Sequence, residues 1–510
     1  MPLNEEECKN IDDVKKLTNV NDVLNCVMPD SLIGLRSDSA SPSDTCIIKF
    51  NPGTKMDGLP LSKGFIKYYV TDTSGVPIQY INEIKALKYE AVIYQWVKQL
   101  IKTGVNGHFV KVLGGADGIN FDTMARFIST YSGMSQEDTD RNLYRNSNFM
   151  TFALPAARPA ITVNKVYKPL PLTEAQVHNF EYAFVLTEGL TIEKLPFETP
   201  STETQVTDNL QALYDLSLGS CMRFHDMISI NAYLQRILGF HANPPLEHAE
   251  NIFHTYLISV LFQACTACYS LYLNGIVHND LHSGNVLVRK IPYTLITYNI
   301  PETGKTYFVF AHFFAKLFDW DRSFSNKVGR NPSLNSPVMF KANQTNDLVQ
   351  QRDFIKLLCY FYKSFYIPDG KTMHMTNIFL TKKLLSAVVK LKPDGFEFNP
   401  SRYDVDTKTT STDWWKNYKR GTNFIHGQTE EYEFQDFWEQ IFIRNRKCLL
   451  NSDFIDAINP ELFEVTIYTL PEIMDNLYNM KDEGGNYYIE REPDPNYPAY
   501  QNVVYNMRKL

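Results

Sequence analysis

Two side chains that carry oxygen donors stand five residues apart in one short segment of the chain. Asp280 and Asn285 belong to the segment HNDLHSGN, which lies between a long apolar stretch and the β-branched sequence VLV. Phosphoryl transfer requires a carboxylate that accepts the proton of an attacking hydroxyl and, about five residues later, an oxygen ligand for Mg²⁺. A small, hard cation prefers oxygen ligands and retains water, so one amide and one or two carboxylates suffice. The spacing therefore predicts Asp280 as a catalytic base and Asn285 as a metal ligand.

The segment HNDLHSGN, with the VLV that follows it, resembles the catalytic loop of the protein-kinase-like superfamily. The resemblance is greatest to the divergent serine/threonine kinases of large nucleocytoplasmic DNA viruses, and similar loops occur in aminoglycoside and choline kinases. It implies an α+β protein with a bilobal kinase-like fold, in which a small antiparallel β N-lobe and a mainly helical C-lobe bind ATP and Mg²⁺. Insertions and a C-terminal extension would complete the chain.

The resemblance implies a second metal ligand in the sequence LFDWD. In the family an apolar strand ends at an aspartate that binds Mg²⁺, and Asp319 holds that position, 34 residues after Asn285. Residues 294–310 between them predict a β-hairpin. Asp321 is a second metal ligand, a partner of Arg322 or a solvated turn carboxylate.

The resemblance also implies a lysine that holds the ATP phosphates and a helix glutamate that orients it. Lys67 lies in the middle of the predicted strand GFIKYYV, where an ammonium is unfavourable unless it meets an anion. Glu90 lies in the sequence YEAVIYQWV, which resembles the family's third helix. We therefore expect a Lys67–Glu90 ion pair, with Lys49 as the competing lysine and Glu83 as the alternative partner. A plain edge-strand lysine that reaches solvent is the structural alternative.

Two further parts of the predicted N-lobe are implied contacts for ATP. In the family a glycine-rich turn covers the phosphates, because glycine lets backbone N–H groups approach the anion closely. Here the corresponding turn is rich in serine, and Ser39 and Ser41 are the candidates, with a plain polar hairpin loop as the alternative. A later apolar strand ends in Thr187, Glu188 and Gly189, where the family's backbone binds adenine.

Four other residues have expected roles in or near the loop. His278 is expected to be a structural hydrogen-bonding residue. His282 stands two residues past the base, where serine/threonine kinases commonly have a lysine that steadies the γ-phosphate and small-molecule kinases commonly have histidine. Asn279 replaces a common arginine, so no activation by an arginine–phosphate pair is expected. Asp353, ahead of an apolar helix, either holds the backbone of the loop or caps the helix.

The composition is that of a soluble globular protein, with 44% hydrophobic and 21% charged residues among 510. A formal net charge of −7 and the lack of a dense basic block argue against nucleic acid as a partner. Eight cysteines without a disulfide or metal pattern predict a reducing compartment, and the first ten residues lack the form of a signal peptide. The C-x-x-C pair Cys265 and Cys268 is expected in a helix core. Residues 255–277 are uncharged and long enough to cross a bilayer, but their polar residues predict a buried helix and no membrane span.

The predicted organisation has four parts. Residues 1–30 form an N-terminal arm, 31–190 an N-lobe with an insertion at about 115–179, 191–400 a C-lobe, and 401–510 a helical extension and tail. The insertion is inferred because so long a structureless segment is unusual within a compact lobe. The tail, rich in tyrosine, asparagine and proline, is expected to wrap a surface or a partner.

The resulting hypothesis is ATP- and Mg²⁺-dependent phosphoryl transfer to serine or threonine hydroxyls of a protein substrate, with Asp280, Lys67, Glu90 and His282 as catalytic residues. The resemblance implies a viral kinase in the host cytoplasm and in the virion, with other virion or capsid proteins as further partners. Two alternatives stay open. The first is a small-molecule kinase of the aminoglycoside or choline type, which a deep acidic acceptor pocket would favour. The second is a catalytically weak kinase fold with a structural role in a virion, which the missing glycine turn and the insertions favour.

Overall fold

The protein is an α+β chain of antiparallel sheets and helices that divides into two compact units in the computed structural model. Unit 1 comprises Met1–Gln99, Val110–Thr191 and Trp320–Asn346, and unit 2 comprises Leu100–Phe109, Ile192–Asp319 and Asp347–Leu510. The residues that the structure describes are 33–36, 43–56, 59–73, 81–132, 135–141, 143, 174–189, 222–224, 244–331, 334, 348, 350–364, 383–384, 386–391, 463–497 and 499–510. The predicted arm at 1–30 and most of the predicted helical extension lie outside them.

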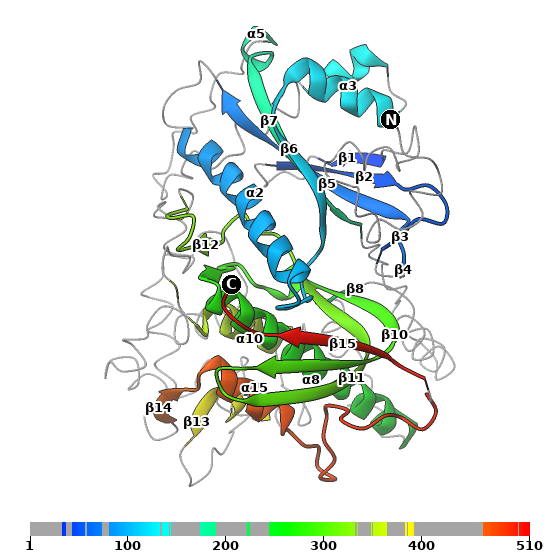
Figure 1. The fold of residues 1–510 in the computed structure, drawn as a ribbon, viewed down its shortest axis with the longest axis vertical. Coiled ribbons are helices and arrows are strands. Elements are labelled where there is room, and N and C mark those ends of the chain that lie inside the picture. Colours follow the sequence, from blue (N-terminus) through cyan, green and yellow to red (C-terminus); the bar gives the residue numbers. More distant parts are fainter. Residues whose placement is uncertain are drawn as a thin grey trace, which may run out of the picture. The chain divides into compact units, whose positions relative to one another are not determined.

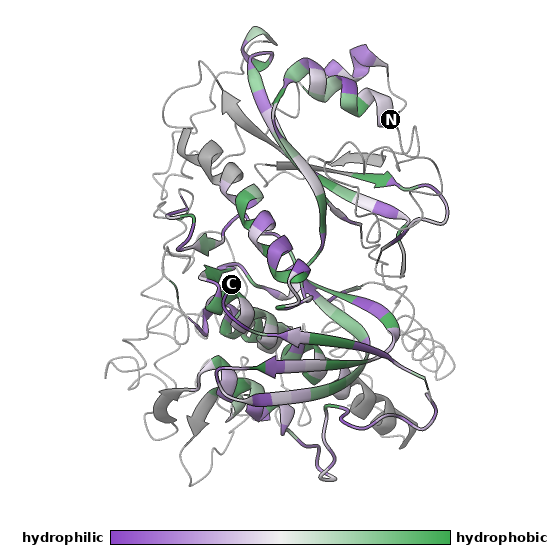
Figure 2. Cartoon of the chain, in the orientation of Figure 1, coloured by the Kyte–Doolittle hydropathy of each residue, from purple (hydrophilic) through white to green (hydrophobic). Residues whose placement is uncertain are grey.

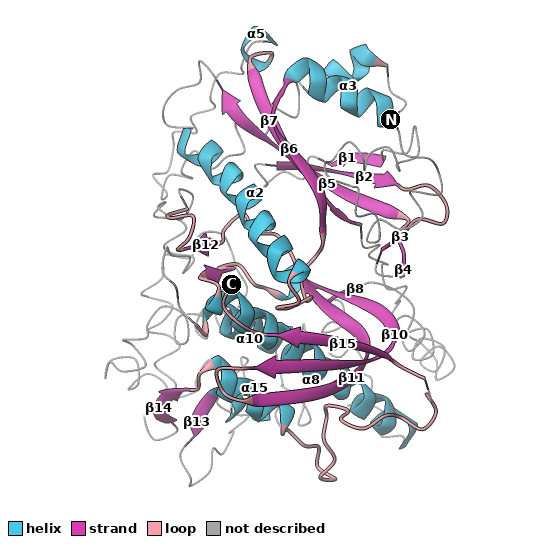
Figure 3. Ribbon diagram, in the orientation of Figure 1, coloured by secondary structure: helices cyan, strands magenta, loops and turns pink. Residues whose placement is uncertain are grey.

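Unit 1 is built on a five-stranded sheet with the order β1-β2-β5-β7-β6, in which all neighbours are antiparallel (Figures 1 and 3). Its strands are β1 Ile33–Arg36, β2 Ser43–Lys49, β5 Lys63–Thr73, β6 Val112–Asn120 and β7 Phe180–Glu188. The two central strands, β5 and β7, coincide with predicted apolar strands, because β-branched and aromatic residues suit a buried pleated surface. The remaining short elements of unit 1 are β3 Lys55–Met56, β4 Leu59–Pro60, α5 Glu174–Val177 and β12 Phe324–Ser325.

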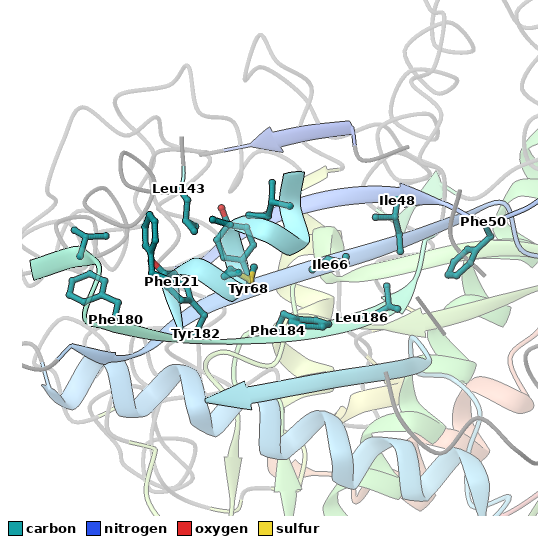
Figure 4. Packing of buried hydrophobic residues seen from close by; sticks show 14 of the residues in the cluster. Ile48, Phe50, Ile66, Tyr68, Phe121, Leu143, Phe180, Tyr182, Phe184 and Leu186 are labelled. Atoms are coloured by element: carbon teal, nitrogen blue, oxygen red, sulfur yellow. The ribbon is translucent and has the colours of Figure 1, made fainter. Parts of the chain in front are cut away.

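The core of unit 1 contains buried side chains of the sheet and of α3 (Phe121–Ser132), several of which appear in Figure 4. Tyr182, Phe184 and Leu186 recur at every second position of β7, which places them on one face of the strand. The α3 side chains recur at helical spacing, at Phe121, Met124, Ala125 and Ile128. These apolar residues therefore hold α3 in the core of the unit.

This arrangement differs from the predicted insertion at about 115–179. Residues up to Asn120 continue β6, and α3 follows at once and joins the core. The glycines of β6 obscured how far the strand continues past Gly114, because glycine is more typical of turns. Gly115 meets a packing requirement instead, since a Cβ there would lie 2.8 Å from the carbonyl oxygen of Phe184.

The helix α2 (Ile81–Lys102) has one buried face. Tyr89, Ile93 and Val97 recur at intervals of four residues and are at most 5% exposed. Hydrophobic and hydrophilic residues alternate around this part of the helix (Figure 2). Glu90 lies next to Tyr89 and is also fully buried.

Unit 2 is organised around the long hairpin of β10 (Val286–Ile300) and β11 (Lys305–Leu317). The two strands pair from Ile300 with Lys305 down to Val286 with Leu317, so the predicted hairpin is confirmed. The C-terminal strand β15 (Gln501–Asn506) runs parallel to β10, and β8 (Met222–Arg223) pairs antiparallel with it. The tail that was expected to wrap a surface therefore joins the sheet of its own chain. The other elements of unit 2 are α8 Pro244–Leu273, β9 Ile276–Val277, the short 3₁₀ turn Ser283–Asn285, α10 Arg352–Ser364, β13 Val389–Leu391, β14 Phe463–Ile467 and α15 Leu470–Tyr478.

The helix α8 leads directly to the candidate catalytic loop. Its segment His254–Leu273 is long and apolar enough to cross a membrane, and 83% of its most apolar window is buried within the protein, as in a core helix. Cys265 and Cys268 are buried in it, which confirms their expected place in a helix core. The Gln263 side chain fixes α8 to β11, because it donates to the Phe313 carbonyl at 3.2 Å and accepts from the Ala315 N–H at 2.8 Å.

Candidate active site

The candidate catalytic loop lies between α8 and β10. Gly275, with a φ of 73°, turns the chain out of α8, and β9 follows. At the other end, Nδ1 of His282 accepts the N–H of Gly284 at 3.0 Å, which caps the 3₁₀ turn. The N–H of Asn285 donates to the His282 carbonyl at 2.9 Å. These local bonds fix the conformation of the loop between Asp280 and Asn285.

Asp353 holds the backbone of the loop from the first turn of α10. Its Oδ2 accepts the N–H of His278 at 2.6 Å, and its Oδ1 accepts the N–H of Asn279 at 2.7 Å. The Asp353 residue is only 5% exposed, so these bonds satisfy backbone donors that have little access to water. The expected contact of Asp353 with the loop is therefore confirmed. The His278 ring also fulfils its expected structural role, because its Nε2 bonds the Phe318 carbonyl at 2.8 Å.

Asn279 and Asp319 have left-handed backbone conformations, with φ values of 63° and 71°. Residues other than glycine rarely adopt this region, and such strain concentrates at functional sites. The two residues with this conformation are Asn279, which precedes Asp280, and the predicted metal ligand Asp319. Arg352 of α10 stabilises the first of them by donating from Nη1 to Oδ1 of Asn279 at 3.2 Å.

The β10–β11 hairpin brings Asp319 back to Asn285. Because Val286 pairs with Leu317, the residues just before β10 and just after β11 become neighbours, and the Phe318 N–H donates to the Asn285 carbonyl at 3.3 Å. The Asn285 side chain is buried, and its Nδ2 donates to the Asp280 carbonyl at 2.9 Å. This bond orients the Asn285 amide, so its Oδ1 lies on the side away from the Asp280 carbonyl.

The donors at this position fit Mg²⁺ by their chemistry. The Asn285 amide and the Asp319 carboxylate offer neutral and anionic oxygen atoms, which a hard cation prefers. Among the described residues, no group of three or more His, Cys, Asp and Glu side chains is placed to hold a metal ion, so a site rich in nitrogen or sulfur is not found there. Two protein oxygen ligands suit a cation that keeps several water ligands and also binds phosphate oxygens.

Asp280 is paired with a lysine that the sequence analysis did not single out. Lys356 of α10 places its Nζ at 2.8 Å from Oδ1 of Asp280 and at 3.2 Å from the carbonyl oxygen of Asn279. The side chains of Lys356 and Asp280 are 6% and 12% exposed. The available signal was a lysine between Ile355 and Leu357 in an otherwise apolar stretch of a helix.

His282 is a neutral imidazole. Burial lowers its pKa to about 4, and the nearby charges of Asp280 and Asp319 offset this only in part. Because Nδ1 accepts the Gly284 N–H, the neutral ring carries its proton on Nε2. His282 can therefore act as a hydrogen-bond donor at neutral pH, whereas a cationic role like that of a lysine does not fit.

In unit 1, Lys67 and Glu90 form the expected ion pair. The Lys67 Nζ lies 2.9 Å from Oε1 of Glu90, and the two side chains are 12% and 0% exposed. The same Oε1 accepts the N–H of Trp320 at 3.3 Å. The competing Lys49 is exposed at the end of β2, which favours Lys67, and the side chain of Glu83 lies outside the described part of α2.

The strand end at Thr187, Glu188 and Gly189 has a structural explanation that the sequence did not reveal. The Glu188 N–H donates to the Lys111 carbonyl at 2.9 Å, and the Gly189 N–H donates to the Lys63 carbonyl at 2.9 Å. Oε1 of Glu188 also accepts the Lys111 N–H at 3.0 Å. A Cβ at position 189 would lie 2.6 Å from the Lys63 carbonyl oxygen. The N–H groups of Glu188 and Gly189 thus bond within unit 1. The expected binding of adenine by the backbone of this strand end stays a prediction.

The structure tells less about the remaining candidate residues. Ser39 and Ser41 lie outside the described residues. Asp321 has its Oδ2 4.0 Å from Nε of the adjacent Arg322, and its side chain is 24% exposed. This geometry is that of a turn carboxylate with a neighbouring cation, one of the three roles considered for it.

Comparison with known proteins gives no further assignment. No protein-family model matches the chain, and no curated protein matches it. The chemical interpretation of the loop therefore depends on its geometry and on the residues that the sequence supplies.

Buried histidines predict a loss of stability in acid. Burial lowers the pKa of His108 to about 3 and those of His254 and His282 to about 4, whereas unfolded histidine titrates near 6.5. Between these values the unfolded chain binds more protons, so stability is fully present above about pH 6.5 and falls as the pH falls toward 4. For each extra proton that the unfolded chain binds, the free energy of unfolding falls by roughly 1.4 kcal/mol per pH unit of acidification. Burial raises the pKa of Asp353 above its ordinary value of 3.8. Between these two values the folded chain binds the extra proton, so Asp353 opposes this trend.

Thermal unfolding measured between pH 8 and pH 4.5 checks this expectation. The melting temperature should be level at the alkaline end and fall steadily below about pH 6.5. His282→Gln should reduce the slope, because it removes one of the three protons. A melting temperature that rises on acidification would contradict the buried, neutral state of these histidines.

Proposed function

We propose that this chain is an ATP- and Mg²⁺-dependent phosphotransferase of the protein-kinase-like type, which phosphorylates serine or threonine hydroxyls of proteins. The proposal is carried by one observation, the register of the β10–β11 hairpin. That register returns Asp319 to Asn285, and Asn285 is bonded to the backbone of Asp280. The candidate base and one candidate metal ligand therefore lie on the loop before β10, and the second candidate ligand lies just after β11 beside it.

Each side chain has a defined task in this proposal. Asn285 and Asp319 would hold Mg²⁺, which neutralises charge on the phosphates when it is bound. Asp280 aligns the acceptor hydroxyl and takes its proton. Lys67, oriented by Glu90, holds phosphate oxygens by charge and hydrogen bonding. The N–H that bonds Glu90 belongs to Trp320, the residue that follows Asp319 in the chain.

A small-molecule kinase is the second candidate. It is favoured by His282, because histidine at this position is common in the aminoglycoside and choline type of loop. The neutral state of His282 agrees with this, since its Nε2–H suits a polar acceptor or a phosphate oxygen. The two candidates share the roles of Asp280, Asn285 and Asp319 and differ in the acceptor.

A transfer assay with γ-labelled ATP separates the candidates. The purified chain is incubated with Mg²⁺ and either a casein-type protein or a set of small amino alcohols and aminoglycosides. We expect label on protein serine and threonine, and none when EDTA removes the metal. Label on the small acceptors alone would replace the first candidate with the second. A chain that labels neither class would point to a structural role in a virion instead.

Lys67→Met is expected to lower kcat/KM for ATP roughly a hundredfold or more, because a charged donor to the transferring group is lost. The buried Glu90 would also lose its partner, which costs about 3–5 kcal/mol of stability. The double variant Lys67→Met/Glu90→Gln, which removes the unpaired charge, should recover stability without recovering activity. Steady-state kinetics and urea denaturation measure the two effects.

Lys49→Met is the matched control for this prediction, since Lys49 is an exposed lysine on the neighbouring strand β2. It should retain the activity of the wild type. If Lys49→Met were inactive and Lys67→Met active, the phosphate-binding lysine would be Lys49.

A further inference from the structure

Lys356 is a buried cation whose bonds lie on the candidate loop. Its neighbours in α10, Ile355 and Leu357, are at most 2% exposed, and Lys356 itself is 5% exposed. Removing an ammonium from water costs several kcal/mol unless an anion and well-formed hydrogen bonds compensate it. Here the compensation comes from the Asp280 carboxylate and the Asn279 carbonyl, at 2.8 and 3.2 Å. Packing alone does not require a lysine at this position.

We propose that Lys356 is a positioning residue for Asp280, which fixes the orientation of its carboxylate. The inference rests on the proposed function, in which Asp280 is the base. A base must be aligned with the acceptor hydroxyl to take its proton, and the Lys356 ammonium holds one oxygen of the Asp280 carboxylate at 2.8 Å. Holding one carboxylate oxygen also removes rotational freedom from the group that must align the acceptor.

The first turns of α10 fix the loop as a whole. Asp353 binds two backbone N–H groups, and Lys356, three residues later on the same face of the helix, binds the next carbonyl and the base. Arg352 binds the Asn279 side chain. A single rigid element therefore sets the backbone and the side chain of Asp280 together.

The other charged and titratable groups near the base do not replace Lys356. They come from the loop, from the end of β11 and from α10, and are His278, His282, Asp319, Arg352 and Asp353. His282 is neutral because burial lowers its pKa to about 4. Arg352 bonds Asn279, and Lys356 bonds the Asp280 carboxylate directly.

The test compares Lys356→Met with the wild type in the labelled-ATP transfer assay. We expect kcat to fall roughly a hundredfold, as for a misplaced catalytic group, with the KM for ATP unchanged. Lys356→Arg keeps the charge and the hydrogen-bond donors, so its kcat should fall by less than that of Lys356→Met. Lys305→Met, at the tip of the hairpin where Lys305 bonds Asp475, should match the wild type in both respects.

A second variant guards against loss of folding. Lys356→Gln keeps hydrogen-bond donors and should fold even if Lys356→Met does not, and its kcat should also fall with the KM for ATP unchanged. An active wild type with an equally active Lys356→Gln would overturn the role of Lys356 and leave the proposed function intact. A wild type without transfer activity would overturn both.

Discussion

Asp280→Asn is expected to lower kcat for phosphoryl transfer roughly 10²–10⁴-fold, the usual contribution of a positioned general base. Asparagine keeps the shape of the side chain but cannot take a proton from the acceptor hydroxyl. Affinity for ATP and Mg²⁺ should change little, because Asn285 and Asp319 supply the metal ligands in this account. Steady-state kinetics with saturating ATP, together with calorimetric titration of ATP, measures the two quantities separately.

Two controls make this result specific to the base. Asp117→Asn removes an exposed carboxylate from β6 and should leave kcat unchanged. Because Asp280→Asn leaves the buried Lys356 without its anion, circular dichroism must show that the variant is folded. Equal labelling by folded Asp280→Asn and wild type would remove Asp280 from the mechanism, and both kinase proposals would fail with it.

Asp353→Ala is expected to combine a large loss of stability with a loss of activity. The change leaves the buried N–H groups of His278 and Asn279 without their acceptor, and each unsatisfied group costs about 1–3 kcal/mol. We expect a decrease of about 3–5 kcal/mol in the free energy of unfolding, as for other buried charged partners. Activity should fall as well, since Asn279 and Asp280 would no longer be held in place.

Urea denaturation of Asp353→Ala and Asp482→Ala gives the matched comparison. Asp482 also accepts a backbone N–H, from Asn486 at 2.8 Å, but in a solvent-exposed turn. Its loss should cost less than about 1 kcal/mol, because water replaces the missing partner. If the two variants were equally stable, the buried carboxylate would not be the anchor of the loop.

The sequence predicted the parts of the site that local patterns determine. A lysine inside an apolar strand, together with the resemblance of YEAVIYQWV to the family's third helix, predicted the Lys67–Glu90 pair, which the structure confirms. The hairpin predicted over residues 294–310 explains how Asp319 approaches Asn285. The catalytic and metal-binding roles of these residues stay predictions.

Contacts that depend on tertiary packing were missed. Lys356 bonds Asp280 across 76 residues, and the sequence shows only a lysine in an apolar helix. The parallel pairing of β15 with β10 joins segments about 200 residues apart, and the short, polar sequence QNVVYN does not reveal its partner. At Glu188 and Gly189 the backbone bonds to neighbouring strands, which a pattern of side chains cannot indicate.

Binding of Mn²⁺ in place of Mg²⁺, in the presence of a non-hydrolysable ATP analogue, tests the central claim most directly. Electron paramagnetic resonance detects free Mn²⁺, whose sharp signal is lost when the ion is bound. The account predicts saturable binding by the wild type that requires the nucleotide analogue, at least tenfold weaker binding by Asn285→Ala and Asp319→Ala, and wild-type binding by Asp117→Asn. Tight nucleotide-dependent binding that survives both substitutions, or no binding by the wild type, would contradict it.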